Sequence, residues 1–168
     1  PRLGNFFYDR LTAKERQVVE ERFIAWGQSV IAELEAEGGG EREVPAYVVQ
    51  YHAAHLKRAD AGIDVFLGLV SDGWQRAWFG FEGAYSGFLN DLHEVWSRLE
   101  SIDARAAERG EEVPYLAEEI RCALCQASVN SLAANLLEGL IAELVEVGIW
   151  QPAQAVAFIS KSIGRGKK

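Results

Sequence analysis

Apolar residues recur along most of the chain at the three- and four-residue spacing of an amphipathic helix. In the first such segment, residues 12–36, they follow the sequence TAKE of residues 12–15, which has the T-x-x-E spacing of a helix capping box. The apolar positions of this segment are Val18, Val19, Phe23, Trp26, Val30, Ile31 and Leu34. The pattern predicts one long helix, and the three glycines of residues 38–40 predict a flexible loop after it.

Further helices are predicted along the rest of the chain, with prolines near their starts and glycines at their ends. The expected segments are 45–60, a short apolar helix 63–70, a helix capped by Ser71 or Asp72, a helix that carries Phe88 and ends near 109, 114–134 with Ile120 and Leu124 among its apolar positions, 136–147, and a last helix from Pro152. Strand-like alternation occurs only in very short runs. We expect an all-α fold, a helical bundle or α-solenoid-like array of about seven or eight antiparallel helices.

Composition narrows the classes of function. The chain has 168 residues, of which 49% are hydrophobic, so it can bury a substantial core. Its net charge of -8 repels phosphate backbones, which excludes nucleic acid as an expected partner. No apolar run approaches the ~20 residues of a membrane-spanning helix, and two cysteines do not make a secreted disulfide framework. We expect a cytoplasmic chain with a solvated basic tail at Lys161, Arg165, Lys167 and Lys168.

Two histidines and two cysteines together form the ligand inventory of a zinc site. His52 and His55 lie in YVVQYHAAHLKRA, and Cys122 and Cys125 lie in CALC. On a helix, both histidines fall on or beside the packing face, and the cysteines lie inside a helix rather than in the tight turn that favours zinc binding or thiolate chemistry. The preferred interpretation is therefore four core residues, with a metal site or a redox pair as the alternatives.

The glycines Gly80, Gly83 and Gly87 share one helical face and do not match a phosphate-binding loop. They predict either a close approach of two helices or a helix break. The adjacent acidic pairs, of which Glu20-Glu21 is the first, are interpreted as solvated helix surface. His93 has acidic neighbours but no evident nucleophile, so we expect no catalytic site, no cofactor and no enzymatic activity.

Six aromatic residues crowd into residues 74–88 and cannot all face one side of a helix. Most of them are expected in the core, and the remainder in an exposed docking patch, because Trp and Tyr are favoured at interface hot spots. The candidates for protein interaction are Trp74, Trp78 and Trp150.

Five stretches also match the pattern of one known family. They are PRLGNFFYDRL at residues 1–11, AYVVQYHAAHLKRA at 46–59, LVSDGWQRAWFGFEGAYSGFLNDLHEVW at 69–96, EEIRCALCQASVNSLAANL at 118–136 and LIAELVEVGIWQPAQAVAFI at 140–159. In this order they resemble the last helix of the winged-helix module, the helices of the following arm, and the start of the helical repeats in bacterial STAND-type signal-transduction ATPases, the NB-ARC and NACHT relatives.

The resemblance implies a fragment from the middle of a larger protein, with the phosphate-binding loop upstream of Pro1. Residues 1–60 would be the end of a winged-helix-like region and the first arm helices. Residues 61–168 would be the arm and the start of a repeat array, unless both regions form one continuous domain. The implied function is a non-catalytic linker that couples a nucleotide-switched core to a C-terminal sensor. Its partners would be other domains of the same protein.

Two other functions stay open at this point. One is a stand-alone α-helical adaptor that binds a protein partner. The other is a small zinc protein built on His52, His55, Cys122 and Cys125. Homo-oligomerisation is compatible with each of the three functions.

Overall fold

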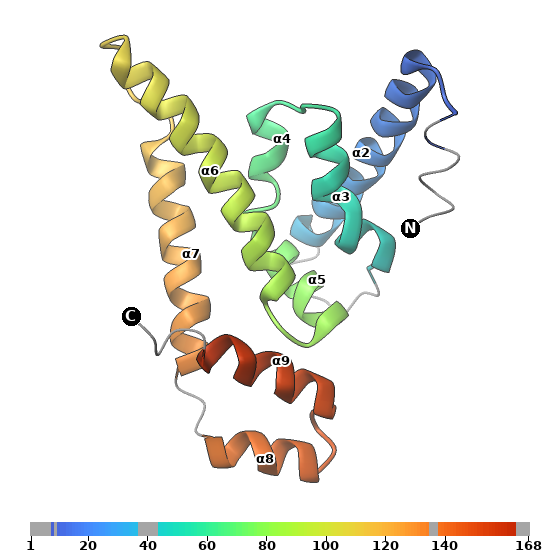
Figure 1. Ribbon diagram of the computed structural model, residues 1–168, viewed down its shortest axis with the longest axis vertical. Coiled ribbons are helices and arrows are strands. Elements are labelled where there is room, and N and C mark those ends of the chain that lie inside the picture. Colours follow the sequence, from blue (N-terminus) through green and yellow to red (C-terminus); the bar gives the residue numbers. More distant parts are fainter. Residues whose placement is uncertain (1–7, 9, 37–43, 135–137, 164–168) are drawn as a thin grey trace. The chain divides into compact units, whose positions relative to one another are not determined.

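The chain is all-α, as the sequence predicts. The computed structural model describes residues 8, 10–36, 44–134 and 138–163, and within these ranges it contains eight helices and no strand (Figure 1). The helices are α2 (Ala13–Ala36), α3 (Ala46–Arg58), α4 (Ile63–Leu67), α5 (Asp72–Glu82), α6 (Ser86–Glu108), α7 (Leu116–Ala134), α8 (Glu138–Glu146) and α9 (Pro152–Ile163). None of the described helices has the length and apolar character needed to cross a membrane.

The chain forms two compact units, Pro1–Trp74 and Gln75–Lys168. The division falls inside α5, at a different place from the boundary near residue 60 that the family resemblance implies. That domain organisation stays a prediction. The predicted glycine loop at 38–40, the stretch 1–7 and the basic tail from residue 164 lie outside the described residues.

The start of α2 has the predicted capping box. The backbone N–H and the hydroxyl of Thr12 both donate to Oε2 of Glu15, at 2.8 and 2.7 Å. The backbone N–H of Glu15 in turn lies 3.3 Å from Oγ1 of Thr12. Because the first turn of a helix has N–H groups without intrahelical partners, these reciprocal bonds fix where α2 begins.

The first unit is built on the packing of α2 against α3. The connection after α3 adds α4 and the start of α5, which bring further large side chains into the core. The buried apolar residues of this unit are Val30, Ile31, Val48, Val49, Leu56, Phe66, Leu69, Val70 and Trp74. Trp74 begins its helix with a backbone N–H that donates to the hydroxyl of Ser71 at 3.2 Å, so Ser71 is the cap of α5.

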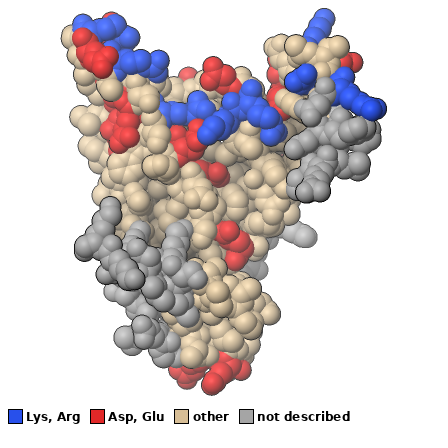
Figure 2. All heavy atoms as spheres, in the orientation of Figure 1, with Lys and Arg blue, Asp and Glu red and all other residues tan. Residues whose placement is uncertain are grey.

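The second unit contains the long helix pair α6–α7 and the shorter pair α8–α9. Gly110, at φ +68°, makes the left-handed turn that closes α6. Both carboxylate oxygens of Asp103 lie within hydrogen-bond distance of the backbone N–H of Tyr115, at 3.1 and 3.2 Å, and so hold the start of α7 against α6. Figure 2 shows acidic and basic side chains together at this turn, over the end of α6 and the start of α7.

Two of the three glycines of residues 80–87, Gly83 and Gly87, lie at positions that require glycine. Gly83 ends α5 with φ +65°, which is a helix break. A Cβ atom on Gly87 would lie 2.1 Å from the Trp78 ring, so the absence of a side chain lets the indole lie directly on α6. The Trp78 indole N–H donates to Oδ2 of Asp91 at 2.8 Å, one turn further along α6. The predicted helix break therefore occurs at Gly83, whereas Gly87 makes room for an aromatic side chain.

The apolar residues of α7 divide between two faces. Cys122 and Val129 are buried, whereas Leu116, Ile120 and Leu124 are 57%, 53% and 65% exposed. The exposed three are spaced four residues apart and therefore form one row along the helix. Two of the apolar positions predicted for this helix, Ile120 and Leu124, thus lie on its solvent side.

The difference between Gly87 and Gly80 gives a matched pair of variants. We expect Gly87→Ala to destabilise the chain by about 2 kcal/mol, because the added methyl group overlaps the Trp78 ring in a closely packed contact. Gly80→Ala should stabilise it by about 0.5–1 kcal/mol, because nothing lies within 4 Å of the added Cβ in the helix interior. Urea unfolding followed by circular dichroism measures both, and a stabilising Gly87→Ala would contradict the close contact.

Candidate functional site

The two histidines of α3 lie on its buried face, as predicted from the helical spacing. His52 is 1% exposed and His55 is 3% exposed. In the second unit, Cys122 is buried and Cys125 is partly buried, and neither forms a disulfide within the described part of the chain. Burial raises the pKa of the Cys122 thiol to about 11, which keeps it protonated and unreactive at neutral pH. Among the described residues no group of three or more His, Cys, Asp and Glu could hold a metal ion.

His55 lies at the centre of a buried polar network between α2 and α3. Its Nδ1 is 2.6 Å from Oε2 of Glu20, and its Nε2 is 3.0 Å from the hydroxyl of Tyr47. Nε of Arg58 donates to Oε1 of Glu20 at 2.9 Å. The ring of Phe23 stacks on the imidazole, with the two centroids 4.4 Å apart. The consecutive helices α2 and α3 are thus joined through one carboxylate, between residues that are 35 positions apart.

The partners of His55 fix its tautomer. The Glu20 carboxylate only accepts hydrogen bonds, so Nδ1 must carry the proton and donate it. Nε2 is then the acceptor for the Tyr47 hydroxyl. Nη2 of Arg58 also lies 2.8 Å from Nδ1, but a guanidinium cannot accept a bond, so this is a close approach and not a second hydrogen bond.

The charge state of the network follows from burial and from these bonds. Burial raises the pKa of Glu20, but hydrogen bonds from His55, Arg58 and Tyr8 outweigh it and bring the pKa below its ordinary value. Burial is also the largest influence on His55 and lowers its pKa, although the neighbouring Glu20 acts in the opposite direction. At neutral pH the network therefore holds an ionised Glu20, a neutral His55 and the cation of Arg58.

The order carboxylate, imidazole, hydroxyl has the form of an acid–base relay, but Tyr47 is not an activated nucleophile. Burial raises the pKa of its phenol, so the phenol keeps its proton. Its hydroxyl donates to Nε2, which leaves the imidazole no free acceptor for a substrate proton. The network gives the buried Glu20 carboxylate its hydrogen-bond partners and orients the side chains of His55, Tyr47 and Arg58. This is a structural role.

His52 lies one turn from His55 and has a different environment. Neither ring nitrogen has a hydrogen-bond partner among the residues that the structure describes. The ring is seated on Gly27 of α2, where a Cβ atom would lie 2.0 Å from Nδ1. The edge of the Trp74 ring covers it, at a centroid distance of 6.0 Å. Burial, with the nearby His55, lowers the pKa of His52 to about 4. The ring is therefore neutral at pH 7 and packs against its neighbours as an apolar group.

Sequence reasoning missed the residue that organises this network. Glu20 is not solvated helix surface as expected, because it is 3% exposed and faces α3. Its neighbour Glu21 is exposed, as expected. A signal was present: Glu20 and Gly27 are seven residues apart, on the face of α2 that the two histidines of α3 meet.

The aromatic cluster at residues 74–88 contains exposed rings as expected, but they are those of Phe79 and Phe81 and not those of the named tryptophans. Trp74 and Trp78 are 0% and 8% exposed and belong to the core, and Trp150 is partly exposed. In the first unit the half-exposed rings are instead those of Trp26, Tyr47 and Tyr51.

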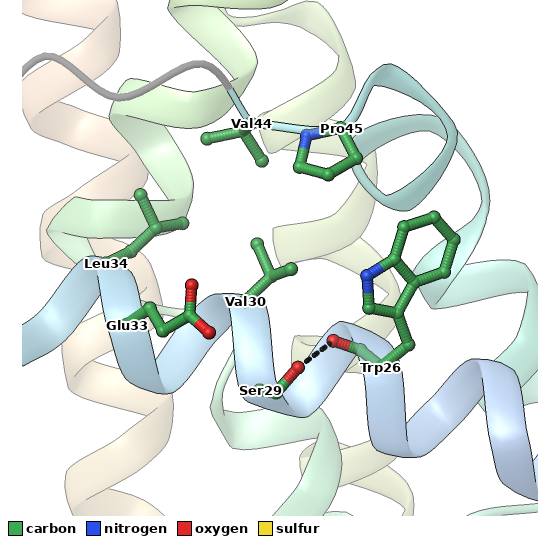
Figure 3. Close-up of a pocket in the computed structure, with 7 residues that line it drawn as sticks. All are labelled: Trp26, Ser29, Val30, Glu33, Leu34, Val44 and Pro45. Carbon is green, nitrogen blue, oxygen red and sulfur yellow. Dashed lines mark hydrogen bonds between the residues drawn. The ribbon is translucent and has the colours of Figure 1, made fainter.

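Beside these rings lies a pocket of about 320 Å³ between α2 and the start of α3 (Figure 3). Its walls are mainly apolar, and Glu33 and Ser29 supply its polar groups. It is lined by Trp26, Ser29, Val30, Glu33, Leu34, Val44 and Pro45.

Comparisons with known proteins give no relative. No family model matches the chain, and neither the curated proteins nor the solved structures contain a significant match.

The unpaired ring of His52 leads to a prediction about acid stability. Its folded pKa of about 4 lies below the ordinary 6.5, so the unfolded chain takes up a proton first as the pH falls. Stability is therefore lost between about pH 6.5 and pH 4, by up to about 3 kcal/mol from this group. We expect His52→Leu to be neutral or mildly stabilising at pH 7 and increasingly stabilising, relative to wild type, toward pH 4.

Urea unfolding at several pH values measures this effect. His93→Leu is the control for replacing a histidine by leucine, because His93 is exposed. A strong destabilisation by His52→Leu at pH 7 would mean that the imidazole has hydrogen-bond partners after all.

The buried carboxylate leads to a second prediction. Glu20→Ala removes the partner of both His55 and Arg58 and should destabilise the chain by about 2–3 kcal/mol, because it leaves the buried Nδ1–H of His55 without a bond. Glu21→Ala, at the exposed neighbouring position, should change stability by less than about 0.5 kcal/mol. Thermal unfolding compares the two, and equal effects would show that Glu20 is not held in the core.

Proposed function

We propose that the chain is a non-catalytic helical linker and protein-interaction module of a larger STAND-type ATPase, in which it couples a nucleotide-switched core to a C-terminal sensor. The observation that supports a packing role is the row of Leu116, Ile120 and Leu124 on α7. The opposite face of α7 already supplies its buried residues, Cys122 and Val129. A second aliphatic row is what a helix inside an array uses to pack against the next repeat.

The arrangement of the second unit agrees with this proposal. Its helices come in consecutive pairs, α6 with α7 and α8 with α9, and α7 also contacts α9. Arrays of this type are extended by adding further pairs, and each pair needs an apolar face on both sides. The family assignment itself is supported by the sequence resemblance, and the partners in this proposal are neighbouring domains of the same cytoplasmic protein.

The buried network also agrees with a role without catalysis. His55 has both nitrogens engaged and Tyr47 keeps its proton, so neither group is available for a substrate. A stand-alone adaptor would use the same row on α7, and the two functions differ in what the natural gene encodes upstream of Pro1. The linker proposal requires a G-x-x-x-x-G-K-[ST] loop there.

The exposed row provides the test of the packing role. Changing Leu116, Ile120 and Leu124 together to Ser should alter the stability of the chain by about 0.5 kcal/mol or less, because all three are exposed. The same change should abolish binding to the downstream segment of the natural protein in a pull-down of purified pieces. Val129→Ser is the matched control, since this residue is 3% exposed and should cost about 2 kcal/mol of stability.

Two results would contradict the proposal. One is unchanged binding of the triple variant to the downstream segment. The other is stoichiometric binding of ATP and Mg²⁺ by this chain in isothermal titration calorimetry, since the linker contains no nucleotide site.

A further inference from the structure

His52 of α3 is a buried imidazole whose polar atoms are not used by the fold. Both ring nitrogens are shielded from solvent, and neither has a hydrogen-bond partner within the described part of the chain. Buried polar atoms are nearly always bonded in folded proteins, so this exception needs an explanation. The ring lies on the backbone of α2 at Gly27, and the Trp74 ring of α5 covers it. Packing alone gives no reason for a titratable ring at this place.

The surroundings of His52 offer no partner for a positive charge. Among the described residues of the first unit, the buried ionisable groups are Glu20, His52 and His55. The two oxygens of the Glu20 carboxylate are already bonded by His55 and Arg58. The acidic residues of α4 and of the first turn of α5, Asp64 and Asp72, are exposed. A buried charge without a partner is costly, so a protonated ring is stable only where water can reach it.

His55, one turn further along α3, differs from His52 because it can take up a second proton where it lies. Its Nδ1 already donates to the ionised Glu20. The Tyr47 hydroxyl, 3.0 Å from Nε2, can accept a hydrogen bond as well as donate one. An imidazolium at this position would therefore have an opposite charge and two acceptors. The conflict between charge and burial is concentrated at His52, where burial holds the pKa at about 4.

The second unit contains a carboxyl pair that responds to acid in the opposite direction. Burial raises the pKa of Glu119 on α7, and the nearby Asp103 and Glu100 of α6 and a hydrogen bond with Asp103 raise it further. A raised carboxyl pKa means that the folded chain takes up the proton before the unfolded chain does. The contact between α6 and α7 therefore gains stability as the pH falls.

We propose that His52 is an acid-sensitive switch: uptake of one proton by its ring separates α3 from α2 and opens the first unit, while the second unit stays folded. Histidine suits this role because its charge changes in mildly acidic solution, and protonation of buried histidines is a known way to open a packed contact. The inference does not rest on the proposed linker function or on the row of α7, so either can fail without the other.

The test is amide hydrogen exchange of the whole chain at pH 7 and pH 5, followed by mass spectrometry and corrected for the intrinsic effect of pH on exchange. Glu20 stays ionised at pH 5, because its pKa is below the ordinary value. Opening returns the pKa of His52 from about 4 to 6.5, so proton linkage raises the opening constant about twentyfold between these pH values. We expect the protection of α3 to fall by this factor and that of α6 not to fall.

Three variants locate the effect at one ring. His52→Leu and His52→Phe cannot take up a proton, and in both the protection of α3 should change by less than about threefold between pH 7 and pH 5. Phe keeps a flat ring on Gly27 and Leu does not, so the pair stays informative if one of them packs poorly. His93→Leu is the matched control, because His93 is exposed and lies in the second unit, and it should retain the full loss in α3.

Three results would overturn the proposal. The first is an equal loss of protection in α3 and α6, which would mean that acid unfolds the whole chain. The second is a loss in α3 that is as large in His52→Leu as in wild type. The third is a His52 ring signal in nuclear magnetic resonance spectra that titrates near pH 6.5 while α3 stays protected, because the folded unit would then accept the charged ring.

Discussion

Each unit depends on a flat ring that lies directly on a helix glycine. In the first unit the His52 imidazole lies on Gly27 of α2, and in the second the Trp78 indole lies on Gly87 of α6. A ring is thin enough to fit between two helices only where the partner helix has no Cβ atom. Glycine in a helix interior costs about 1 kcal/mol, so the close contact has to offset that loss.

The ring nitrogens of Trp78 and His52 differ in their hydrogen bonding. The indole N–H of Trp78 donates to Asp91, one turn beyond Gly87 on the same face of α6, so the ring is packed and bonded at once. The nitrogens of His52 have no such partner, and the polar bonds between α2 and α3 are made one turn away, by His55 with Glu20. The first unit therefore combines an apolar contact that requires a neutral imidazole with a network that requires an ionised Glu20, which accepts from His55 and pairs with Arg58. Both conditions hold near neutral pH and both weaken in acid, because the pKa values of His52 and Glu20 lie below their ordinary values.

Much of this fold could be predicted from local sequence signals. The helical segments, the capping box at Thr12 and the inward direction of both histidines depend on residues within a few turns of one another, which periodicity detects. The partner of His55 could not be found this way, because Glu20 is 35 residues distant and stands next to a second glutamate that is exposed. The buried face of α7 was ambiguous for another reason. Its two faces are both apolar, and spacing alone does not tell which one meets α6.

The aromatic cluster at residues 74–88 divides between core and surface, because Trp74 and Trp78 are buried whereas Phe79 and Phe81 are 41% and 39% exposed. Further exposed rings come from α2 and α3, where no cluster is visible in sequence. The two exposed apolar surfaces also differ in chemistry. The row on α7 is aliphatic and spaced by helical turns, which suits another helix, whereas the strip of Trp26, Tyr47 and Tyr51 is flat and aromatic. Ridges and grooves of helices interlock through side chains spaced by helical turns, so the row on α7 is the surface that supports packing against a further helix pair in the proposed array.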